Sequence, residues 1–534
     1  MSEPRTVLRG GMIVDGTLPE PWLADLAMQD GVITAVGEIV AEEGDVVFDA
    51  TGRYLMPGFI DTHSHADGAV FRDDVQRALL KQGVTTVIAG QDGVSYAPGD
   101  GAYAAEYFAA LNGAHPSYQS GGVETLLAGY DGTTPVNVGY LVPAGTVRHE
   151  VKGYEPDEAS PDEVASMRAL VKQGLDEGAL GLSTGLDYVP GIHQNTAELI
   201  QMSAPVAAAG GIYVTHMRGG YEGNSRLGTD EVAAIAGATG VRAHISHYHG
   251  PSHLLLDLVD ELAGQGVNIS FDAYPYRRGC SLLAMPILPP ALLSGPRAEV
   301  LAALNEPAER RQLLDEWFPA LEANPLIGPE WPDNLALAHI ASAEYDWAHG
   351  MSVRDAAARA GSDPATFVLD LLVAAQLEVS VVMTVRDQRP YDDLARIITH
   401  PAHMVGSDAI YIGKHPHPRG RGTYAKFLRL FTRERGDYSW ADAARHLSGQ
   451  AAEQFGLVDR GRLEVGCAAD VVLVDPERVS DEASYESPLA EAVGIDDVFV
   501  GGRQVLAAGR LTGVNSGRGL RRGVPVPSAT VTND

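Results

Sequence analysis

Two histidines separated by a single residue, His63 and His65, are the strongest chemical signal in this sequence. They lie in PGFIDTHSHAD, residues 57–67, directly after the apolar run YLM. Residues i and i+2 of a β-strand point to the same face, so both imidazoles would project together and supply half of a metal site. Surface histidines are the alternative interpretation of an isolated pair. The apolar strand predicted before them, and the polar residues at its carboxyl end, favour the metal site.

Two more histidines end apolar, β-branched runs further along the chain. His216 lies in YVTHMRGG, and His247 lies in AHISHYHG about one βα unit later. Burying a histidine without a hydrogen bond is costly, so a hydrogen-bonded core histidine is the alternative for each. Both stand at the ends of predicted strands, which favours metal ligation.

Short strands are predicted at both ends of the chain. Residues 5–50 alternate apolar and polar side chains between Gly and Asp turn signals, and the pattern returns within 461–509. Neither end looks able to close a core alone. We therefore expect residues 1–56 and 459–520 to pair into one small, discontinuous β-sandwich domain, followed by a C-terminal tail at 521–534.

Between these ends, at residues 57–458, short apolar runs alternate with amphipathic helical stretches. This order predicts an α/β fold with a parallel sheet, and eight or so such units form a TIM-like (β/α)8 barrel with its active site at the carboxyl ends of the strands. From about 280 to 335 the chain is rich in proline, which indicates an insertion in a βα loop near that site. The expected barrel strands include residues 85–89, 135–142, 211–217, 241–247, 267–274, 334–340, 380–385 and 403–408.

Composition excludes several classes of function. The 534 residues carry 70 acidic and 39 basic side chains, a net charge of −31, whereas nucleic-acid binding needs clustered Lys and Arg. The two cysteines, Cys280 and Cys467, provide no disulfide framework and favour a reducing compartment. We find no apolar leader and no membrane-length apolar run. We therefore expect a cytoplasmic protein that binds neither nucleic acid nor membrane; the sequence leaves a homo-oligomer open.

Several segments, in order along nearly the whole chain, resemble the amidohydrolase superfamily of metal-dependent hydrolases. PGFIDTHSH resembles the first-strand signature of that superfamily. The segments that resemble its D-aminoacylase (N-acyl-D-amino-acid deacylase) branch are GVTTVIAGQDGVS (83–95), LGLSTGLDYVPG (180–191), YVTHMRGG (213–220), AHISHYHG (243–250) and VGSDAI…HPHPRGRGTY (405–424). The resemblance implies a barrel beside a domain built from both chain ends, and a zinc-dependent enzyme that hydrolyses a small amide.

The resemblance also implies roles for the matching residues. Asp408, in VGSDAI, matches the catalytic aspartate of the superfamily, although a lone Ser-Asp pair is otherwise typical of a helix N-cap. A metal ion lowers the pKa of its bound water toward 7, and a nearby carboxylate can take the proton and pass it to the leaving amine. The implied metal ligands are His216, His247 and Asp92 at one site, with His63 and His65 at the second.

Asp92 departs from the pattern of the D-aminoacylases. They carry a metal-ligating cysteine in the middle of GNCG, where this chain has AGQDG. A carboxylate bridges two divalent ions as a thiolate does, but it is a harder ligand that accepts oxygen-loving metals more readily. We expect Asp92 to be a ligand; an Asp-Gly turn residue is the alternative.

An amide substrate that bears a carboxylate needs a cationic or hydrogen-bonding clamp. Tyr188, in the family motif STGLDY, is a candidate to hold the oxyanion or the carboxylate. His249 stands where relatives often have lysine, a change expected to alter substrate preference. Guanidinium groups bind carboxylates bidentately, and the candidates are Arg277, Arg278, Arg386 and Arg419.

The leading hypothesis is a hydrolase with one or two zinc ions, or another divalent ion, that cleaves an N-acyl-D-amino acid or a similar small amide. A hydantoinase-like cyclic-amide hydrolase and a dipeptidase are the alternatives among enzymes. Hydantoinase relatives use a carboxylated lysine as bridge, and Asp92 in the bridging position speaks against that route. An inactive metal-binding protein of the same fold is the non-enzyme alternative. The presence of Asp408 disfavours it, because metal binding alone does not require that carboxylate.

Overall fold

An eight-stranded parallel sheet forms the centre of the molecule. The computed structural model describes residues 4–219, 221–324, 327–384 and 389–525, and in this part the sheet has the order β16-β12-β11-β10-β9-β8-β7-β6. The sheet curls into a nearly closed TIM-like barrel. Its two edge strands, β16 and β6, approach each other, as shown by the hydrogen bond that Asp408 N–H donates to His63 O (2.8 Å) just beyond them. The predicted barrel is therefore confirmed. Its strands are Phe59–Asp61 (β6), Val84–Ala89 (β7), Asn137–Pro143 (β8), Gly181–Gly185 (β9), Ile212–His216 (β10), Arg242–Ile245 (β11), Ile269–Ala273 (β12) and His403–Val405 (β16).

Burial on both faces explains the composition of the barrel strands. Every residue of β7 and of β8 is buried, and strands covered on both faces lack the alternation of a half-exposed sheet. The helices between them start at clear sequence signals, such as the capping box of Ser160 and Glu163 before α5. No helix in the described ranges is long and apolar enough to cross a membrane. The helices are Asp73–Leu80 (α1), Ala102–Tyr107 (α2), Val123–Tyr130 (α3), Ala144–Lys152 (α4), Pro161–Asp176 (α5), Thr196–Ala208 (α6), Ser225–Thr239 (α7), Ser252–Gly264 (α8), Tyr391–Ile398 (α16), Arg419–Lys426 (α17), Trp440–Ala444 (α18) and Gln450–Gln454 (α19).

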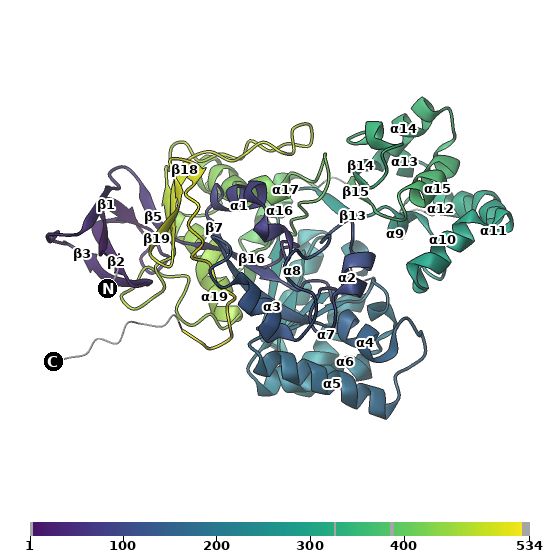
Figure 1. Ribbon diagram of the computed structural model, residues 1–534, viewed down its shortest axis with the longest axis horizontal. Helices are drawn as coiled ribbons and strands as arrows, with labels where there is room; N and C mark the ends of the chain where they lie inside the picture. The colour runs from purple at the N-terminus through teal and green to yellow at the C-terminus, as the bar shows by residue number, and fades with distance from the viewer. Residues whose placement is uncertain (1–3, 220, 325–326, 385–388, 526–534) are drawn as a thin grey trace.

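Strands from both chain ends form one mixed, nine-stranded sheet beside the barrel, where the purple and yellow parts of the chain meet (Figure 1). The strand β17 pairs antiparallel with β5 and so links the two ends. The sheet encloses its own apolar core, which includes Leu26, Leu55 and Phe499. The predicted pairing of the two ends is confirmed. The strands are Thr6–Ile13 (β1), Trp22–Gln29 (β2), Val32–Gly37 (β3), Val46–Asp49 (β4), Tyr54–Pro57 (β5), Val471–Val474 (β17), Ile495–Val500 (β18), Arg503–Ala507 (β19) and Arg510–Leu511 (β20).

Between β12 and β16 the chain leaves the barrel and builds a lobe of its own, drawn in green at the right of Figure 1. Its centre is a three-stranded antiparallel sheet with the order β13-β15-β14, packed against a second apolar core. The elements are Arg278–Leu282 (β13), Leu335–Ile340 (β14), Val379–Thr384 (β15), Ala284–Ile287 (α9), Arg297–Asn305 (α10), Pro307–Gln312 (α11), Phe318–Ala323 (α12), Trp331–Asn334 (α13), Val353–Ala360 (α14) and Pro364–Ala374 (α15).

This lobe corrects part of the predicted barrel. The runs at 334–340 and 380–385 were expected as barrel strands, and this is wrong: they contribute β14 and β15 to the antiparallel sheet. The barrel takes β9 instead, together with the strand predicted before His63. An apolar run of five or six residues fits any buried strand, and the run itself does not specify the neighbour with which it pairs.

Candidate metal centre

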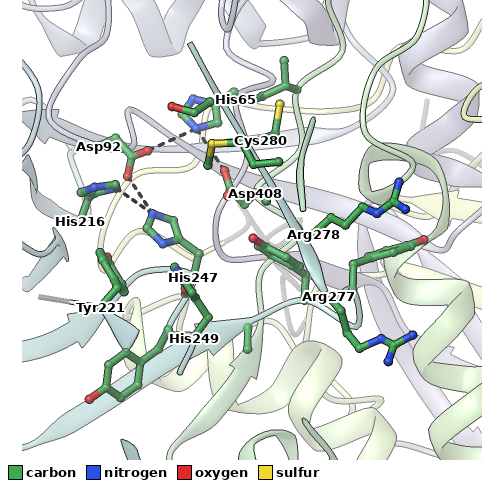
Figure 2. Close-up of a pocket in the computed structure, with 18 of the residues that line it drawn as sticks. His65, Asp92, His216, Tyr221, His247, His249, Arg277, Arg278, Cys280 and Asp408 are labelled. Carbon is green, nitrogen blue, oxygen red and sulfur yellow. Dashed lines mark hydrogen bonds and ion pairs between the residues drawn. The ribbon is translucent and has the colours of Figure 1, made fainter. Parts of the chain in front are cut away.

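Four histidines and two carboxylates converge at the carboxyl ends of the barrel strands. Figure 2 shows five of them, His65, Asp92, His216, His247 and Asp408, beside the cavity. Asp92 belongs to both groups whose donor atoms all lie within 4.8 Å of one another. The structure therefore brings together all six residues expected as metal ligands or catalytic acid. One group is His63, His65, Asp92 and Asp408, and the other is Asp92, His216 and His247.

Asp92 joins the two groups because its two oxygens face different histidines. Oδ1 lies 3.5 Å from Nε2 of His63 and 3.7 Å from Nε2 of His247. Oδ2 lies 3.5 Å from Nε2 of His65. On the far side of this carboxylate, Nδ1 of His216 lies 3.0 Å from Nε2 of His247. A carboxylate in this position is able to contact two ions at once.

The donor atoms of this cluster fit a metal ion better than they fit one another. Both ring nitrogens of His63 and Oδ1 of Asp92 are buried without a hydrogen-bond partner. The nitrogen–oxygen distances of 3.4–3.7 Å between the histidines and the two carboxylates are longer than the ~2.7–3.2 Å of a hydrogen bond. They are close to the roughly 3.3 Å between two ligands of a tetrahedral ion with bonds of about 2.0 Å. Imidazole and carboxylate together suit zinc and neighbouring divalent ions.

The backbone at three of these residues adopts a left-handed conformation. Asp92 has φ 55°, His247 φ 35° and Asp408 φ 50°, values that are uncommon outside glycine. Gly185, the last residue of β9, allows the loop after β7 to approach, because a Cβ there would lie 2.0 Å from the carbonyl oxygen of Asp92. Such conformations persist where the surrounding structure holds side chains in a required position.

Two polar side chains that the sequence did not single out orient the histidines. Asn112 Oδ1 lies 3.0 Å from Nδ1 of His65. Asp187 Oδ2 lies 3.3 Å from Nε2 of His216. Partners of this kind fix the tautomer and the direction of a ligating ring. Asp187 stands next to Tyr188 within the quoted motif, so its position there was the available signal; Asn112 has no comparable sequence context.

Asp272, near the end of β12, contacts the backbone and side chains of residues in and beside the cluster. Its Oδ1 accepts a hydrogen bond from the backbone N–H of His247 (2.8 Å), and its Oδ2 lies 2.9 Å from Nε2 of His244. Oδ2 is also 3.5 Å from Nδ1 of His63. An acidic residue at the carboxyl end of a predicted barrel strand was a usable signal, since that end carries the active site.

Both carboxylates of the cluster are held in the ionised form. Burial raises the pKa of Asp408, but Arg419 and the neighbouring histidines outweigh it and lower this pKa to about 2. Burial is likewise outweighed at Asp92, where His63, His247 and His65 hold the pKa well below its usual value. The two carboxylates therefore carry negative charge at neutral pH, and although burial opposes it, they in turn raise the pKa of His63 and His65.

A cavity of about 310 Å³ opens over the cluster, a size that falls at the lower end of small-molecule sites. Arg277 and Arg278 lie across this cavity from Asp92 and His216 (Figure 2). The guanidinium of Arg277 stacks 4.7 Å from the ring centre of Tyr391, and that of Arg278 stacks 4.1 Å from the ring centre of Tyr485. Both residues line the cavity, but their guanidinium groups are turned away from Asp92 and His216 (Figure 2).

Of the other residues expected to contact the substrate, two line the cavity and one does not. Tyr188 lines the cavity and packs its ring 4.8 Å from that of His216. His249 also lines the cavity, stacked 4.9 Å from the ring of Tyr221. Arg419 is buried against Asp408 and is not part of the cavity wall. Arg386 lies outside the described residues.

Comparison with known proteins identifies the family of this chain. The model of the amidohydrolase family matches residues 46–506. The D-aminoacylase of Alcaligenes xylosoxydans xylosoxydans is 30% identical over 540 residues, which cover 97% of each chain. The N-acyl-D-aspartate deacylase of the same organism is 30% identical over 98% of this chain and 96% of its own. The crystal structure of N-acyl-D-glutamate deacylase from Bordetella bronchiseptica, with zinc and a phosphonate inhibitor, matches with a TM-score of 0.79 at 29% identity over 97% of this chain and 99% of its own. The chain therefore belongs to the amidohydrolase family.

Proposed function

We propose that this protein is a zinc-dependent hydrolase that cleaves the amide bond of an N-acyl-D-amino acid. One observation carries the proposal: four histidines and two carboxylates form a cluster whose donor atoms are spaced for ions, and this cluster borders a cavity that Arg277 and Arg278 also line. The D-amino-acid class of substrate is taken from the relatives, which span nearly the same length.

The histidine ligands would form two pairs, one for each ion. His216 and His247 would hold one ion and His63 and His65 the other, with Asp92 shared between them. Zinc bound there supplies a Lewis acid for the amide carbonyl and lowers the pKa of water toward 7. The shared carboxylate also admits manganese more readily than a thiolate would.

Asp408 is the residue we assign to proton transfer. Its Oδ1 faces the cluster, 3.4 Å from Nε2 of His65, and the residue lines the cavity. A carboxylate at this place accepts a proton from the attacking water and donates it to the amine that leaves. That transfer is required for amide cleavage, because an amine is a poor leaving group until it is protonated.

The cavity offers separate places for the two ends of the substrate. Arg277 and Arg278 would bind the substrate carboxylate, since a guanidinium pairs with a carboxylate through two parallel hydrogen bonds. Tyr188, whose ring contacts that of His216, would donate to the oxyanion that develops at the carbonyl. His249 would bound the cavity on the side of Tyr221 and restrict which acyl or side chain fits.

A substrate panel tests this function. Purified zinc-loaded protein is incubated with N-acetyl-D-amino acids, their L enantiomers, dipeptides and hydantoins, and release of the free amine is measured. We expect turnover of the D enantiomers, with Asp408→Asn protein as the control for contaminating hydrolases. Turnover of hydantoins or dipeptides without turnover of N-acyl-D-amino acids would replace the proposed substrate. Metal-loaded protein that cleaves none of them would instead support the inactive alternative.

A further inference from the structure

Tyr221, in the loop after β10, packs its ring against three histidines of the cavity wall. The distance between ring centres is 5.3 Å for His216, 5.2 Å for His247 and 4.9 Å for His249. Figure 2 shows Tyr221 beside His216 and His247. These two histidines belong to one of the two groups of candidate ligands. The ring of Tyr221 therefore limits how far their imidazoles can move.

The hydroxyl of Tyr221 joins the backbone beside the same two ligands. It accepts a hydrogen bond from the N–H of Met217 (3.0 Å), the residue after His216. It donates one to the carbonyl oxygen of Ser246 (3.2 Å), the residue before His247. A tyrosine hydroxyl can donate and accept at the same time, so both bonds form together. One oxygen atom thus connects the two segments that carry His216 and His247.

This hydroxyl stands where the pairing of β10 with β11 would continue. The two parallel strands place Thr215 opposite Ile245, and just beyond them Ser246 N–H donates to the carbonyl oxygen of Thr215 (3.0 Å). A residue in a parallel ladder bonds to two residues of the neighbouring strand that are two positions apart. The next bond would therefore run from Met217 N–H to the carbonyl oxygen of Ser246. The Tyr221 hydroxyl bridges these two groups, at the point where both strands reach their histidines.

We propose that Tyr221 is a positioning residue that fixes the spacing of His216 and His247 for the ion that they would share. The inference rests on the ligand roles proposed for these two histidines. Nδ1 of His216 lies 3.0 Å from Nε2 of His247, and an ion held by both rings requires the rings to keep such a separation. Replacing a group that holds a ligating ring in place typically lowers metal affinity. Tyr221 acts on both rings at once, by ring packing and by the backbone bridge.

The residue that follows Tyr221 anchors it to the cavity wall. Nη1 and Nη2 of Arg389 donate to the two carboxylate oxygens of Glu222 (2.6 and 3.1 Å), and such a bidentate pair fixes geometry as well as charge. The backbone N–H of Glu222 donates to the carbonyl oxygen of His249 (3.2 Å). Glu222 has φ 51°, a left-handed conformation that persists where surrounding contacts hold it. These contacts keep Tyr221 in place against the histidines.

A direct contact with the substrate is the alternative role, because Tyr221 also lines the cavity. Its hydroxyl proton is already donated to Ser246, however, and the hydroxyl would have to give up that bond to donate to a substrate. The two roles differ in what they affect. A positioning residue changes zinc affinity, whereas a substrate contact changes kcat or KM and leaves zinc affinity unchanged.

Zinc affinity, measured by competition with a chelator, tests the proposal without turnover. Tyr221→Phe removes the hydroxyl and keeps the ring. Tyr118→Phe is the matched control, because the hydroxyl of Tyr118 also contacts two backbone segments, at the carbonyl oxygens of Gly99 (3.0 Å) and Gly121 (2.6 Å). We expect Tyr221→Phe to lower zinc affinity about 10–100-fold, the cost of losing a group that holds a ligand. Tyr118→Phe should leave the affinity unchanged, and an unchanged affinity in Tyr221→Phe would overturn the proposal.

A cycle with His216→Ala separates positioning of the ligands from a general structural role. His216→Ala should lose the ion that His216 and His247 hold, and Tyr221→Phe should weaken the same ion. In the His216→Ala background, Tyr221→Phe should not weaken the remaining zinc further, because no ligand pair is left to space. A further loss in the double variant would overturn the proposal. If His216→Ala itself binds zinc like wild type, the ligand role of His216 fails, and the inference fails with it.

Two other measurements complete the test. In steady-state kinetics, a lower kcat or a higher KM for Tyr221→Phe at unchanged zinc affinity would overturn the proposal and identify the hydroxyl as a substrate contact. A crystal structure of the zinc-loaded wild-type protein needs no variant. It should show the Tyr221 hydroxyl bonded to Met217 and Ser246, with an ion on His216 and His247. A hydroxyl that has left both backbone groups would contradict the positioning role.

Discussion

Replacing Asp92 should weaken both halves of the metal centre at once. Asp92 is the carboxylate shared by the two ligand groups, and Asp92→Ala removes its contacts of 3.5–3.7 Å to His63, His65 and His247. Loss of an outer partner of a ligand already costs about 10–100-fold in metal affinity. Loss of the shared ligand should cost at least that factor, or about 1.4–2.7 kcal/mol at about 1.4 kcal/mol per tenfold.

The assay is metal content at controlled free zinc. Wild type, Asp92→Ala and Asp92→Cys proteins are dialysed against zinc buffers and analysed for bound zinc and for turnover. Asp470→Ala is the control for loss of a buried carboxylate, because Asp470 accepts a hydrogen bond from Asn137 at the amino end of β8, away from the cluster. Asp92→Ala should lose metal and activity together. Asp92→Cys should keep at least one tightly held zinc and discriminate more strongly against manganese, since thiolate is the softer ligand.

Two outcomes would refute this reasoning. The first is an Asp92→Ala protein that binds zinc and turns over like wild type. The second is a crystal structure of the zinc-loaded protein in which Asp92 lies beyond about 4 Å from every ion, past any zinc–oxygen bond.

Further replacements test other parts of the account. Asp408→Asn should keep zinc content and thermal stability but lower kcat by roughly 10²–10⁴-fold; a rate near wild type would make this carboxylate structural. Asp187→Ala should lower zinc affinity about 10–100-fold, because it frees the ring of His216, as measured by competition with a chelator; unchanged affinity would show that His216 needs no such partner. Burial lowers the pKa of His446 to about 4, below the about 6.5 of an unfolded chain. As the pH falls, the unfolded state therefore binds the proton first. The free energy of unfolding is highest above pH 6.5 and falls by about 3 kcal/mol as the pH approaches 4. In urea titrations at several pH values, His446→Gln should reduce this fall in the free energy of unfolding, and an unchanged fall would contradict the argument.

The histidines of the candidate metal centre could be predicted because each stands at or just beyond a strand end, whereas Asp92 was expected from the family resemblance. His63 and His65 share a face by their spacing, and His216 and His247 end apolar runs. The residues that orient them could not be found in this way. Asn112 and Asp187 lie in loops, and only the fold brings them within 3.0–3.3 Å of a histidine.

The barrel was predictable as a whole but not strand by strand. The sequence of β9, GLSTG, has small residues and weak β-propensity, yet β9 is buried between β8 and β10. The β15 run, VSVVMT, has the stronger local signal but pairs in the antiparallel sheet of the lobe. The burial of Arg419 against Asp408 could not be predicted, because sequence gives the type of a side chain and not its partner.

The metal dependence of amide cleavage tests the central claim most directly. Protein stripped with a chelator should show no release of amine from an N-acetyl-D-amino acid that the untreated enzyme cleaves. Adding zinc should restore turnover as one to two ions bind per chain, measured by elemental analysis of the same samples. Full turnover in protein shown to be free of metal would contradict the account.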